Sequence, residues 1–533
     1  MVDKRIHDLY RGLVNGQLSR RDFLARAAAL GVSASAANMF LKAADVRAQE
    51  LDAGGAPVVA TGDGTLFAGA EITVQVIDAS VKVPLDEVRP EFEAATGAKV
   101  NIVADPIETA FAKLLEDAAT GTNSLDGSII GMWWLGELVA GNFIASYDDW
   151  YNDESGTFPQ FDAEDELPGM QALRMYDGKR YVVPYDSDGQ ALYYRRDLLT
   201  DASHMEAYKE ATGNDLGVPT TWDELFDIAS YFNDQGTDGI SMHLKVGGQG
   251  MFHYMSLSAP YVIGPENPTL YWFDPETMEP LVQSAGHVEA AEMIKKLFEL
   301  GPEAQAGWAL GEAWDHFLQG NAVFTFSWGD VLPLAVEQDS PVNGNVGTAQ
   351  LPGTMAYTNP LTGDRYETSE PNLVGNTTGG SWAGVIMSGS EYPEAVYYFL
   401  AIMATEEKQK FYAARGSDGV DPGRISQMPP EAVEGGLGSV DDYISQGFAE
   451  ADALEYTRAY YDTFQNPNQL PYLRIPGTFE YWTALDIRLS EFVTGQVDSA
   501  EDAMAALAQD FADINDRLGI DEQLEVYRAS LGL

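Results

Sequence analysis

An alternation of strand-like and helix-like segments near the start of the chain restricts its fold more than any other feature. Three segments have the alternating, β-branched composition of strands, residues 71–77, 99–103 and 127–132. Two segments with apolar side chains at helical spacing lie between them, residues 85–95 and 107–119. Strands joined by helices of about ten or more residues form crossover units around a mainly parallel sheet. The sequence therefore predicts an α/β fold.

Tryptophan side chains directly follow two of the predicted strands. Met132 is followed by Trp133 and Trp134, and Trp328 follows a short apolar strand at residues 322–326. Ligands of parallel sheets bind outside the carboxyl ends of the strands. These three Trp side chains are therefore candidates for an aromatic surface against a ligand, and packing in the core is the alternative for each.

Residues 178–197 (GKRYVVPYDSDGQALYYRRD) combine two apolar runs with an acidic break. The apolar runs have strand composition and cover residues 180–183 and 191–194. The polar residues between them are typical of a turn. This pattern suits a crossing between two lobes, because side chains at the break then face the space that the lobes enclose. Tyr185, Asp186 and Asp188 are candidate site residues on this argument.

Length and charge limit the class of protein. The 533 residues exceed one ordinary core, because the prior is about 150 residues per domain, so two or three domains are expected. The 82 Asp and Glu residues outnumber the 31 Lys and Arg, and the net charge is −51. Nucleic acid is bound chiefly through Lys and Arg, so it is excluded as a partner. Such an acid excess is typical of a solvated surface in salty surroundings.

The residue types present also argue against a bound metal or cofactor. Cysteine is absent, which excludes disulfides, thiolate metal ligands and a lipid anchor on an N-terminal Cys. The run Asp186-Ser187-Asp188 continues with Gln190 and Ala191, where a calcium loop prefers Asp or Asn and then Gly. After the N-terminus no apolar stretch of about 18 residues occurs, so no membrane span is predicted. We predict no metal and no cofactor.

Residues 1–48 have the pattern of a targeting segment. Arg20 and Arg21 precede an Ala-rich run at residues 27–41, and Val46-Arg47-Ala48 suits cleavage beside small residues. This pattern resembles a twin-arginine export signal, with an ordinary amphipathic helix as the alternative. A Gly- and Ala-rich linker is expected at residues 49–70.

A second crossing is predicted at residues 379–384, where a Gly-rich turn leads into a strand. Gly380 allows the backbone to bend or to approach a ligand closely, and Trp382 lies beside it. Thr221 and Glu224 have the spacing of a capping box before a helix. Other helices are predicted at residues 288–300, 393–404, 448–461, 479–494 and 500–518. Two stretches are not assigned to regular elements, residues 239–285 and 339–378, the second of which has loop composition.

Eight segments, in this order, resemble the extracellular solute-binding proteins of ABC importers, in the sugar-binding group that includes maltose-binding protein. They are residues 71–97, 134–141, 178–198, 219–225, 327–329, 380–385, 393–409 and 475–496. The strings GKRYVVPY, LYYRRDL and PTTWDEL belong to these segments. No single segment is specific, and their order carries the resemblance.

The resemblance implies two α/β lobes, each a mainly parallel sheet flanked by helices, joined by a multi-strand hinge. The N-terminal lobe is expected to contain residues 71–185 and about 384–440, and the C-terminal lobe about 190–380 and 441–533. Hinge crossings are expected at residues 185–190 and 379–384, with a third near residue 440. Three surface loops exceed the family pattern, residues 201–217, 265–284 and 355–376.

The resemblance also implies a function. The protein is expected to be a periplasmic monomer without enzymatic activity that binds a mono- or oligosaccharide in its cleft and delivers it to the permease subunits of an ABC transporter. Asp188 matches a hinge acid that binds sugar hydroxyls in this family. Aromatic contacts are expected from Trp133 or Trp134, from Trp328, and from Tyr481 or Trp482, and Arg424 matches a turn that lines the site. Carboxylates accept strong hydrogen bonds from hydroxyls, and aromatic rings cover the C–H face of a pyranose.

Other functions were weighed against this one. The same fold is open to a uronate, with Arg424 or Arg180 as counter-charge, and to a polyamine, which suits the acid excess. A glycosidase or lyase requires paired carboxyl groups, and Asp186 with Asp188 is such a pair by sequence. However, the six His residues lack metal spacing, and neither a nucleophile elbow nor a phosphate-binding loop is present. The enzyme is the weakest of these alternatives.

Overall fold

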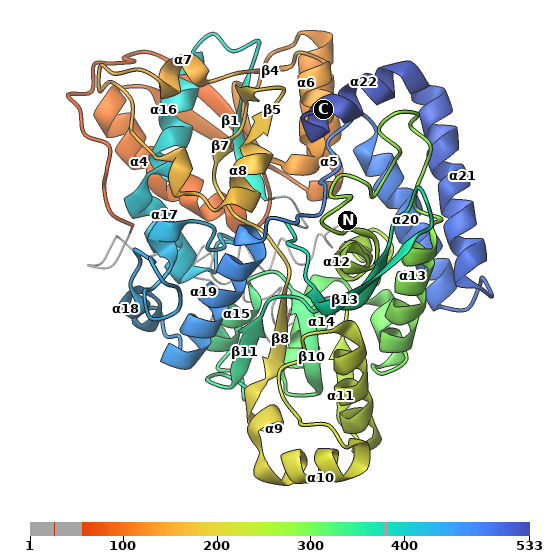
Figure 1. The fold of residues 1–533 in the computed structure, drawn as a ribbon. Helices are drawn as coiled ribbons and strands as arrows, with labels where there is room; N and C mark the ends of the chain where they lie inside the picture. The colour runs from red at the N-terminus through yellow and green to blue at the C-terminus, as the bar shows by residue number, and fades with distance from the viewer. Residues whose placement is uncertain (1–25, 27–55, 378–380) are drawn as a thin grey trace.

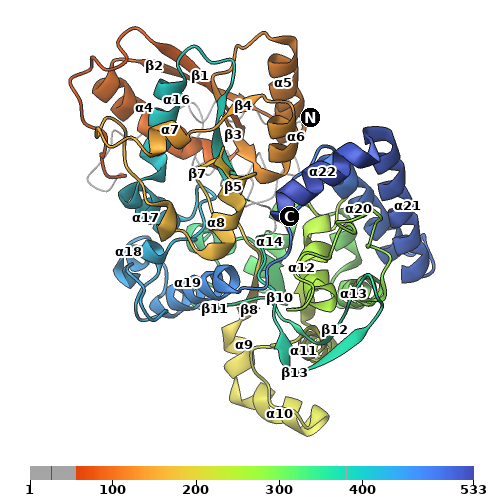
Figure 2. The same ribbon diagram turned by 45° about the horizontal axis from the view of Figure 1, so that its top comes forward.

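The computed structural model describes Arg26 and residues 56–377 and 381–533. The described chain forms two lobes, and segments from both long ranges contribute to each lobe (Figures 1 and 2). The N-terminal lobe is drawn mainly in orange and teal, and the C-terminal lobe in yellow, green and blue. The expected export signal and Gly380 lie outside the described residues. No helix within the described residues is long and apolar enough to cross a membrane.

The sheet of the N-terminal lobe has the strand order β2-β1-β3-β14-β4, and β7 also pairs with β14. Its strands are β1 (Glu71–Ile77), β2 (Lys99–Asp105), β3 (Gly127–Gly131), β4 (Ile144–Ala145), β7 (Val183–Pro184) and β14 (Trp382–Met387). The pairs β1–β2 and β1–β3 are parallel, whereas β14 is antiparallel to β3, with Trp382 opposite Gly131. The carboxyl end of β3 and the amino end of β14 therefore lie at the same edge of the sheet.

Helices flank this sheet. They are α4 (Val83–Thr96), α5 (Ile107–Thr120), α6 (Leu135–Ala140), α7 (Asp148–Tyr151), α8 (Pro168–Arg174), α16 (Pro393–Ala404) and α17 (Glu406–Arg415). Both crossover helices end at a left-handed glycine, Gly97 with φ 76° after α4 and Gly121 with φ 68° after α5. Glycine adopts this conformation without the strain that a Cβ atom causes, so the sequence ends each helix where the next strand begins.

The sheet of the C-terminal lobe has the order β11-β8-β10-β9. Its strands are β8 (Ala191–Arg195), β9 (Asp238–Ser241), β10 (Ala322–Ser327) and β11 (Val346–Ala349). Only β9 and β10 are parallel, and β8 is antiparallel to both β10 and β11. The expectation of a mainly parallel sheet is wrong for this lobe. The reason is that β8 enters from the edge where β10 ends, so the two strands run in opposite directions.

The helices of the C-terminal half complete this lobe. They are α9 (Arg196–Thr200), α10 (Ala202–Thr212), α11 (Trp222–Asp234), α12 (Met251–Val262), α13 (Ala285–Phe298), α14 (Leu310–Leu318), α15 (Val331–Glu337), α18 (Val440–Ser445), α19 (Glu450–Gln465), α20 (Thr478–Val493), α21 (Ala500–Leu518) and α22 (Ile520–Leu531). Helix α11 begins with the predicted capping box, in which Thr221 and Glu224 bond each other's backbone N–H groups. Helix α19 packs on β11, and α22 contacts α6 of the other lobe.

Two segments that the sequence left unassigned are regular. Helix α12 lies within residues 239–285, and every residue from Phe252 to Val262 is buried. A helix buried on all sides has no polar face, so its sequence shows no amphipathic period. Residues 339–378 were expected to be a loop, which is wrong: they contain β11 and a hairpin of β12 (Thr354–Thr358) and β13 (Arg365–Asn372). Most of β13 is exposed, so its polar composition resembles that of a loop.

The predicted strand at residues 180–183 is divided in two. Its first part belongs to β6 (Lys179–Arg180), which pairs with β5 (Met175–Tyr176), and its last residue begins β7. Strand β7 pairs with β14 through Val183 and Pro184. The chain therefore leaves the N-terminal sheet at Pro184 and enters the C-terminal sheet at Ala191.

Candidate ligand-binding site between the two lobes

The strand ends of the two sheets bring candidate side chains to the region between the lobes. In the N-terminal sheet, β3 ends at Gly131 opposite Trp382, and the short helix η2 (Met132–Trp134) follows directly. In the C-terminal sheet, Ala191 at the start of β8 lies opposite Ser327 at the end of β10. Because Trp328 follows Ser327, tryptophans from both lobes occupy the strand ends, as the sequence predicted.

Six aromatic side chains from both lobes form one group, the aromatic cluster: Trp133, Trp134, Phe252, Trp328, Trp382 and Trp482. Trp133 is at its centre, with ring centroids 5.4 Å from Trp382, 6.3 Å from Trp482 and 6.4 Å from Phe252. Phe252 in turn lies 5.5 Å from Trp328 and 5.3 Å from Trp482. Trp133 and Trp382 remain partly exposed, so the cluster presents aromatic surface to solvent between the lobes.

Four aspartates lie beside these aromatic rings and form the acid cluster: Asp186, Asp188, Asp330 and Asp421. Asp186 is bonded to the start of β14, since its N–H donates to the carbonyl of Trp382 at 3.1 Å. The N–H of Asp188 donates to Ser381 Oγ at 2.8 Å. Asp330 follows Trp328 by two residues at the opposing sheet edge. The acidic break predicted from the sequence therefore meets both lobes.

Asp421 connects the lobes through its carboxylate. Oδ2 accepts the N–H of Gly329 at 3.0 Å, and the hydroxyls of Tyr456 and Tyr460 on α19 donate to the same carboxylate at 3.1 and 2.6 Å. The N–H of Asp421 donates to Asp186 Oδ1 at 2.9 Å. Asp186 and Asp421 are buried, and their bonds hold the crossing segments together.

Asp188 and Asp330 are partly exposed and have a different environment. Removal from bulk water, and then the charges of Asp186 and Asp421, raise the pKa of Asp188 well above its ordinary value. The pKa of Asp186 is raised as well, chiefly because the residue is removed from bulk water. Removal from bulk water, followed by the charge of Asp186, raises the pKa of Asp330 to about 7.

Several buried polar atoms around the two clusters have no hydrogen-bond partner within the described residues. Gln190 Nε2, Tyr472 Oη and Trp482 Nε1 are three of them, and His243 Nε2, whose ring lies 5.5 Å from that of Trp328, is another. The ring of Tyr472 lies 5.3 Å from that of Trp482, and burial followed by the charge of Asp188 raises the pKa of Tyr472. Unmet donors in a buried place are costly unless a ligand or water satisfies them.

Three of the residues predicted for the site lie elsewhere. Tyr185 points into the N-terminal lobe, where its hydroxyl donates to the carbonyl of Val81 at 2.6 Å. Tyr481 packs in the C-terminal lobe and donates to Asn515 Oδ1 at 2.6 Å. Arg424 is buried, and its Nη1 donates to the carbonyl of Ala404 at 3.0 Å. None of the three contacts the aromatic cluster in the described residues, so we leave them out of the proposed site.

The sequence is matched by a family model over residues 87–424, more than half of the chain, and that family is the bacterial extracellular solute-binding proteins. The chain belongs to this family. It is therefore a binding protein and not an enzyme, and the family name implies an exported protein. The two-lobed architecture described above is the one that its structural relatives share.

Individual relatives of this solute-binding protein are distant. The mannitol-binding protein of Pseudomonas aeruginosa is 24% identical over 410 residues, 75% of this chain and 82% of that protein. The erythritol/L-threitol-binding protein of Mycolicibacterium smegmatis is 24% identical over 231 residues, and the match spans only 46% of that protein. A ribitol-bound ABC transporter solute-binding protein from Agrobacterium radiobacter is 19% identical, with a TM-score of 0.64 over 85% of this chain and all of that one.

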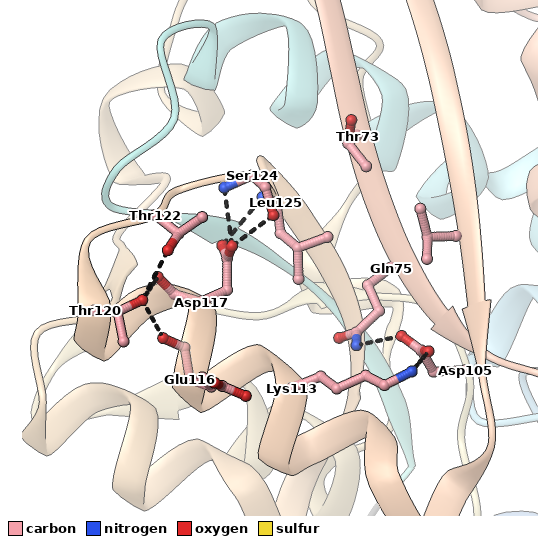
Figure 3. A pocket seen from close by; sticks show the side chains of 11 residues that line it. Thr73, Gln75, Asp105, Lys113, Glu116, Asp117, Thr120, Thr122, Ser124 and Leu125 are labelled. Atoms are coloured by element: carbon pink, nitrogen blue, oxygen red, sulfur yellow. Dashed lines mark hydrogen bonds and ion pairs between the residues drawn. The ribbon is translucent and has the colours of Figure 1, made fainter.

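The solute-binding protein has a separate groove of 690 Å³ in its N-terminal lobe, between β1, β2 and α5 (Figure 3). Its polar side chains satisfy each other. Asp117 accepts the N–H groups of Ser124 and Leu125 at 3.0 and 3.1 Å, and Gln75 donates to Asp105 at 2.9 Å. No atom of these groove side chains is among the unpartnered buried polar atoms of the described residues. The groove therefore has no unmet hydrogen-bonding capacity of the kind found between the lobes.

Sequence reasoning missed four members of the interlobe site. Asp330 follows a predicted strand. The rule that selected Trp328, that residues after a strand end are site candidates, could also have selected Asp330. Asp421 and Tyr472 lie in loops without a distinctive pattern. Phe252 lies on α12, whose uniform burial hides its orientation.

Proposed function

We propose that this protein captures a small polyol or sugar between its lobes and delivers it to the transmembrane permease of an ABC importer. One observation carries the proposal: aromatic faces and carboxyl groups from both lobes meet at the facing edges of the two sheets. Family membership supports the transport role. The names of the relatives, which bind mannitol and erythritol or L-threitol, and the ribitol complex support a polyhydroxylated ligand.

The chemistry of the side chains suits such a ligand. A polyol has C–H surface that aromatic rings cover and hydroxyls that donate to carboxylates, and charge-assisted bonds of this kind are the stronger ones. The unmet donors Gln190 Nε2 and Trp482 Nε1 and the hydroxyl of Tyr472 supply further partners for ligand oxygens. We place the ligand against Trp133, Trp382, Trp328 and Trp482, with Asp188 as the first carboxyl contact.

We further propose that the lobes move about the segments at residues 185–190 and 379–384. Asp186 joins the first segment to Trp382 at the start of β14, and Asp421 bonds both Asp186 and Gly329. Closure of the lobes excludes water from the ligand and thereby strengthens its hydrogen bonds. The residues at 378–380 are outside the described part of the chain.

A uronate is not favoured as the ligand. Its carboxylate needs a cation, and the two candidates are used elsewhere. Arg180 pairs with Asp148 at 3.0 Å and lies over the ring of Tyr151, while Arg424 is buried against the carbonyl of Ala404. The acid cluster repels a further carboxylate.

The route of export belongs to the same proposal. The Arg20-Arg21 pair and the Ala-rich run after it support twin-arginine export, and the family description supports a location outside the cytoplasm, which we take to be the periplasm. Replacement of both arginines by Lys is expected to retain the precursor in the cytoplasm, as measured by cell fractionation. Normal export of that variant contradicts the assignment.

The binding function is tested by isothermal titration of the purified protein with mannitol, ribitol, erythritol, maltose and galacturonate. We expect saturable one-site binding of at least one neutral compound, quenching or enhancement of Trp fluorescence on binding, and recovery of the ligand unchanged after long incubation. Absence of binding to all four neutral compounds, or the appearance of a reaction product, contradicts the proposal.

A further inference from the structure

The charge balance between the lobes is one-sided. The acid cluster contributes four carboxyl groups, and within the described residues no Lys or Arg forms an ion pair with any of them. Arg174 is bonded to this region through the backbone: its Nη2 donates to the carbonyl of Asp186 at 2.7 Å, while Nε and Nη2 also bind Glu166. The carboxyl charge is therefore not neutralised by the protein itself.

Two of the four carboxyl groups are available to a ligand. The carboxylates of Asp186 and Asp421 are buried, and both accept hydrogen bonds from backbone N–H groups. The carboxylate of Asp421 also accepts a hydrogen bond from the hydroxyl of Tyr460. Asp188 and Asp330 are partly exposed, and each lies three residues from the paired strand ends Ala191 and Ser327. Their neighbours are also linked: the Tyr460 hydroxyl lies 2.9 Å from the carbonyl oxygen of Gly189 and 2.6 Å from Asp421 Oδ2, which accepts the N–H of Gly329 at 3.0 Å. Asp188 lies in the crossing before β8, where its N–H bonds Ser381 beside β14, and Asp330 lies in the turn after β10 of the C-terminal lobe.

An independent observation indicates that a polar ligand belongs at this place. Tyr472 is 94% buried, and its hydroxyl has no hydrogen-bond partner among the described residues. Burial, and then the charge of Asp188, raise its pKa. Trp482, whose ring is 5.3 Å from that of Tyr472, has an unpartnered Nε1. The aromatic rings beside these atoms also favour a cation, because the face of an indole ring attracts positive charge.

Resting on the proposed function, we propose that the ligand carries a protonated amine: it is an amino polyol or amino sugar whose ammonium group lies between Asp188 and Asp330 and whose carbon chain packs against the aromatic cluster. The ammonium group replaces protons that the carboxyl groups otherwise hold against their mutual repulsion. It also gives one charged contact to the crossing, through Asp188, and one to the C-terminal lobe, through Asp330.

The same geometry disfavours a neutral polyol of equal size. Its hydroxyls accept or donate at Asp188 and Asp330 but bring no positive charge to the acid cluster. A polyamine without hydroxyls balances the charge but leaves Gln190 Nε2 and Trp482 Nε1 without partners and offers flexible methylene chains to the rings. An amino polyol satisfies both requirements at once.

The test uses matched pairs of ligands that differ in one group: sorbitol against 1-amino-1-deoxysorbitol, and glucose against glucosamine, with spermidine as a third arm. Titration of the full chain at pH 7.5 gives the dissociation constant of each compound. In any pair that binds, we expect the amine to bind at least about tenfold more tightly than the matching hydroxyl compound. The binding enthalpy of the amine is expected to differ between phosphate and Tris buffers. The sign of the difference should be that of proton release from the protein to the buffer.

Two variants sharpen the test. Asp330→Asn is expected to remove the preference for the amine, lowering its affinity about tenfold while the hydroxyl partner changes less than about threefold. Asp117→Asn, in the separate groove, is the matched control and is expected to leave both affinities unchanged.

Four outcomes are decisive. A hydroxyl compound that binds as tightly as its amine partner overturns the amine proposal and leaves the binding function standing. Spermidine binding more tightly than either amine overturns it in favour of a polyamine site. Equal loss of affinity for both members of a pair in Asp330→Asn assigns Asp330 a general role and also overturns it. Absence of binding by every compound overturns this inference together with the proposed function.

Discussion

The interlobe site and the groove beside α5 are both lined by carboxyl groups, and they differ in how those groups are satisfied. In the groove, Asp117 and Asp105 accept hydrogen bonds from neighbouring backbone and side-chain donors. Between the lobes, the pKa values of Asp188 and Asp330 are raised, and neither carboxyl group forms an ion pair with a Lys or Arg among the described residues. The groove's carboxyl groups thus have structural partners, and unmet hydrogen-bonding capacity between the lobes is the better indicator of a binding site.

The largest effect that separates the two regions is expected for Asp188→Ala. Loss of charge-assisted hydrogen bonds should reduce affinity for the best neutral ligand by about 2–4 kcal/mol. The thermal midpoint should not fall, because the removed carboxyl group is repelled by Asp186 and Asp421. Calorimetric titration and thermal scanning measure the two quantities, and an unchanged dissociation constant would show that the site is misplaced.

The next effect concerns the aromatic cluster. Trp133→Ala removes the ring that contacts Trp382, Trp482 and Phe252, and we expect a loss of about 1.5–3 kcal/mol of binding free energy. Trp308, which packs on His316 away from the cluster, is the control, and Trp308→Ala should bind normally. Fluorescence titration distinguishes them. Equal losses in the two variants would mean that Trp133 acts only through stability.

The groove is expected to behave in the opposite way. Asp117→Ala leaves the N–H groups of Ser124 and Leu125 without their acceptor, which should lower the free energy of unfolding by about 1–2 kcal/mol. Ligand affinity should not change. Urea denaturation with titration of the folded variant checks both. A loss of affinity with no loss of stability would turn the groove into a second ligand site.

The smallest effect concerns how the free energy of unfolding depends on pH. The sign of this dependence is expected to be opposite in the two regions. The raised pKa of Asp330, about 7 against an ordinary 3.8, means that its contribution to stability is present below pH 3.8 and lost as the pH rises through 7. Asp330→Asn should therefore match the wild type near pH 4 and exceed it at pH 8, by less than about 1 kcal/mol after solvent screening.

Asp105 provides the contrast. Burial acts to raise its pKa, but hydrogen bonds from Lys113 and Gln75 outweigh it, so the pKa is lowered from 3.8. Its stabilising contribution is present above that value and lost as the pH falls through the folded pKa. Asp105→Asn should be less stable than the wild type at pH 7, and the difference should disappear in acid. Thermal midpoints measured from pH 3 to 8 test both variants, and slopes of the same sign would refute the distinction.

Local chemistry was readable from the sequence where it depends on neighbours in the chain. The capping box of Thr221 and Glu224, the helices α16 and α21 with their observed bounds, and the strand β1 are all set by side-chain spacing. The same spacing placed Trp133, Trp134 and Trp328 directly after strands, and those side chains do reach the region between the lobes. Each of these features requires only short-range physical rules.

The remaining features depended on contacts between distant residues. Nothing near Asp421 in the chain indicates that its carboxylate bonds Gly329 and two tyrosines of α19. The sequence of helix α12 has no amphipathic period because the helix is buried on every side. Tyr481 and Trp482 point in different directions because successive side chains of a helix lie on different faces.

The sequence by itself determined the alternation of strands and helices, the family, and the acidic crossing at residues 185–190. Only the tertiary structure decided which acids are buried and hydrogen-bonded in the crossing and which stay partly exposed, because burial and unpaired charge are properties of the assembled lobes and not of any segment.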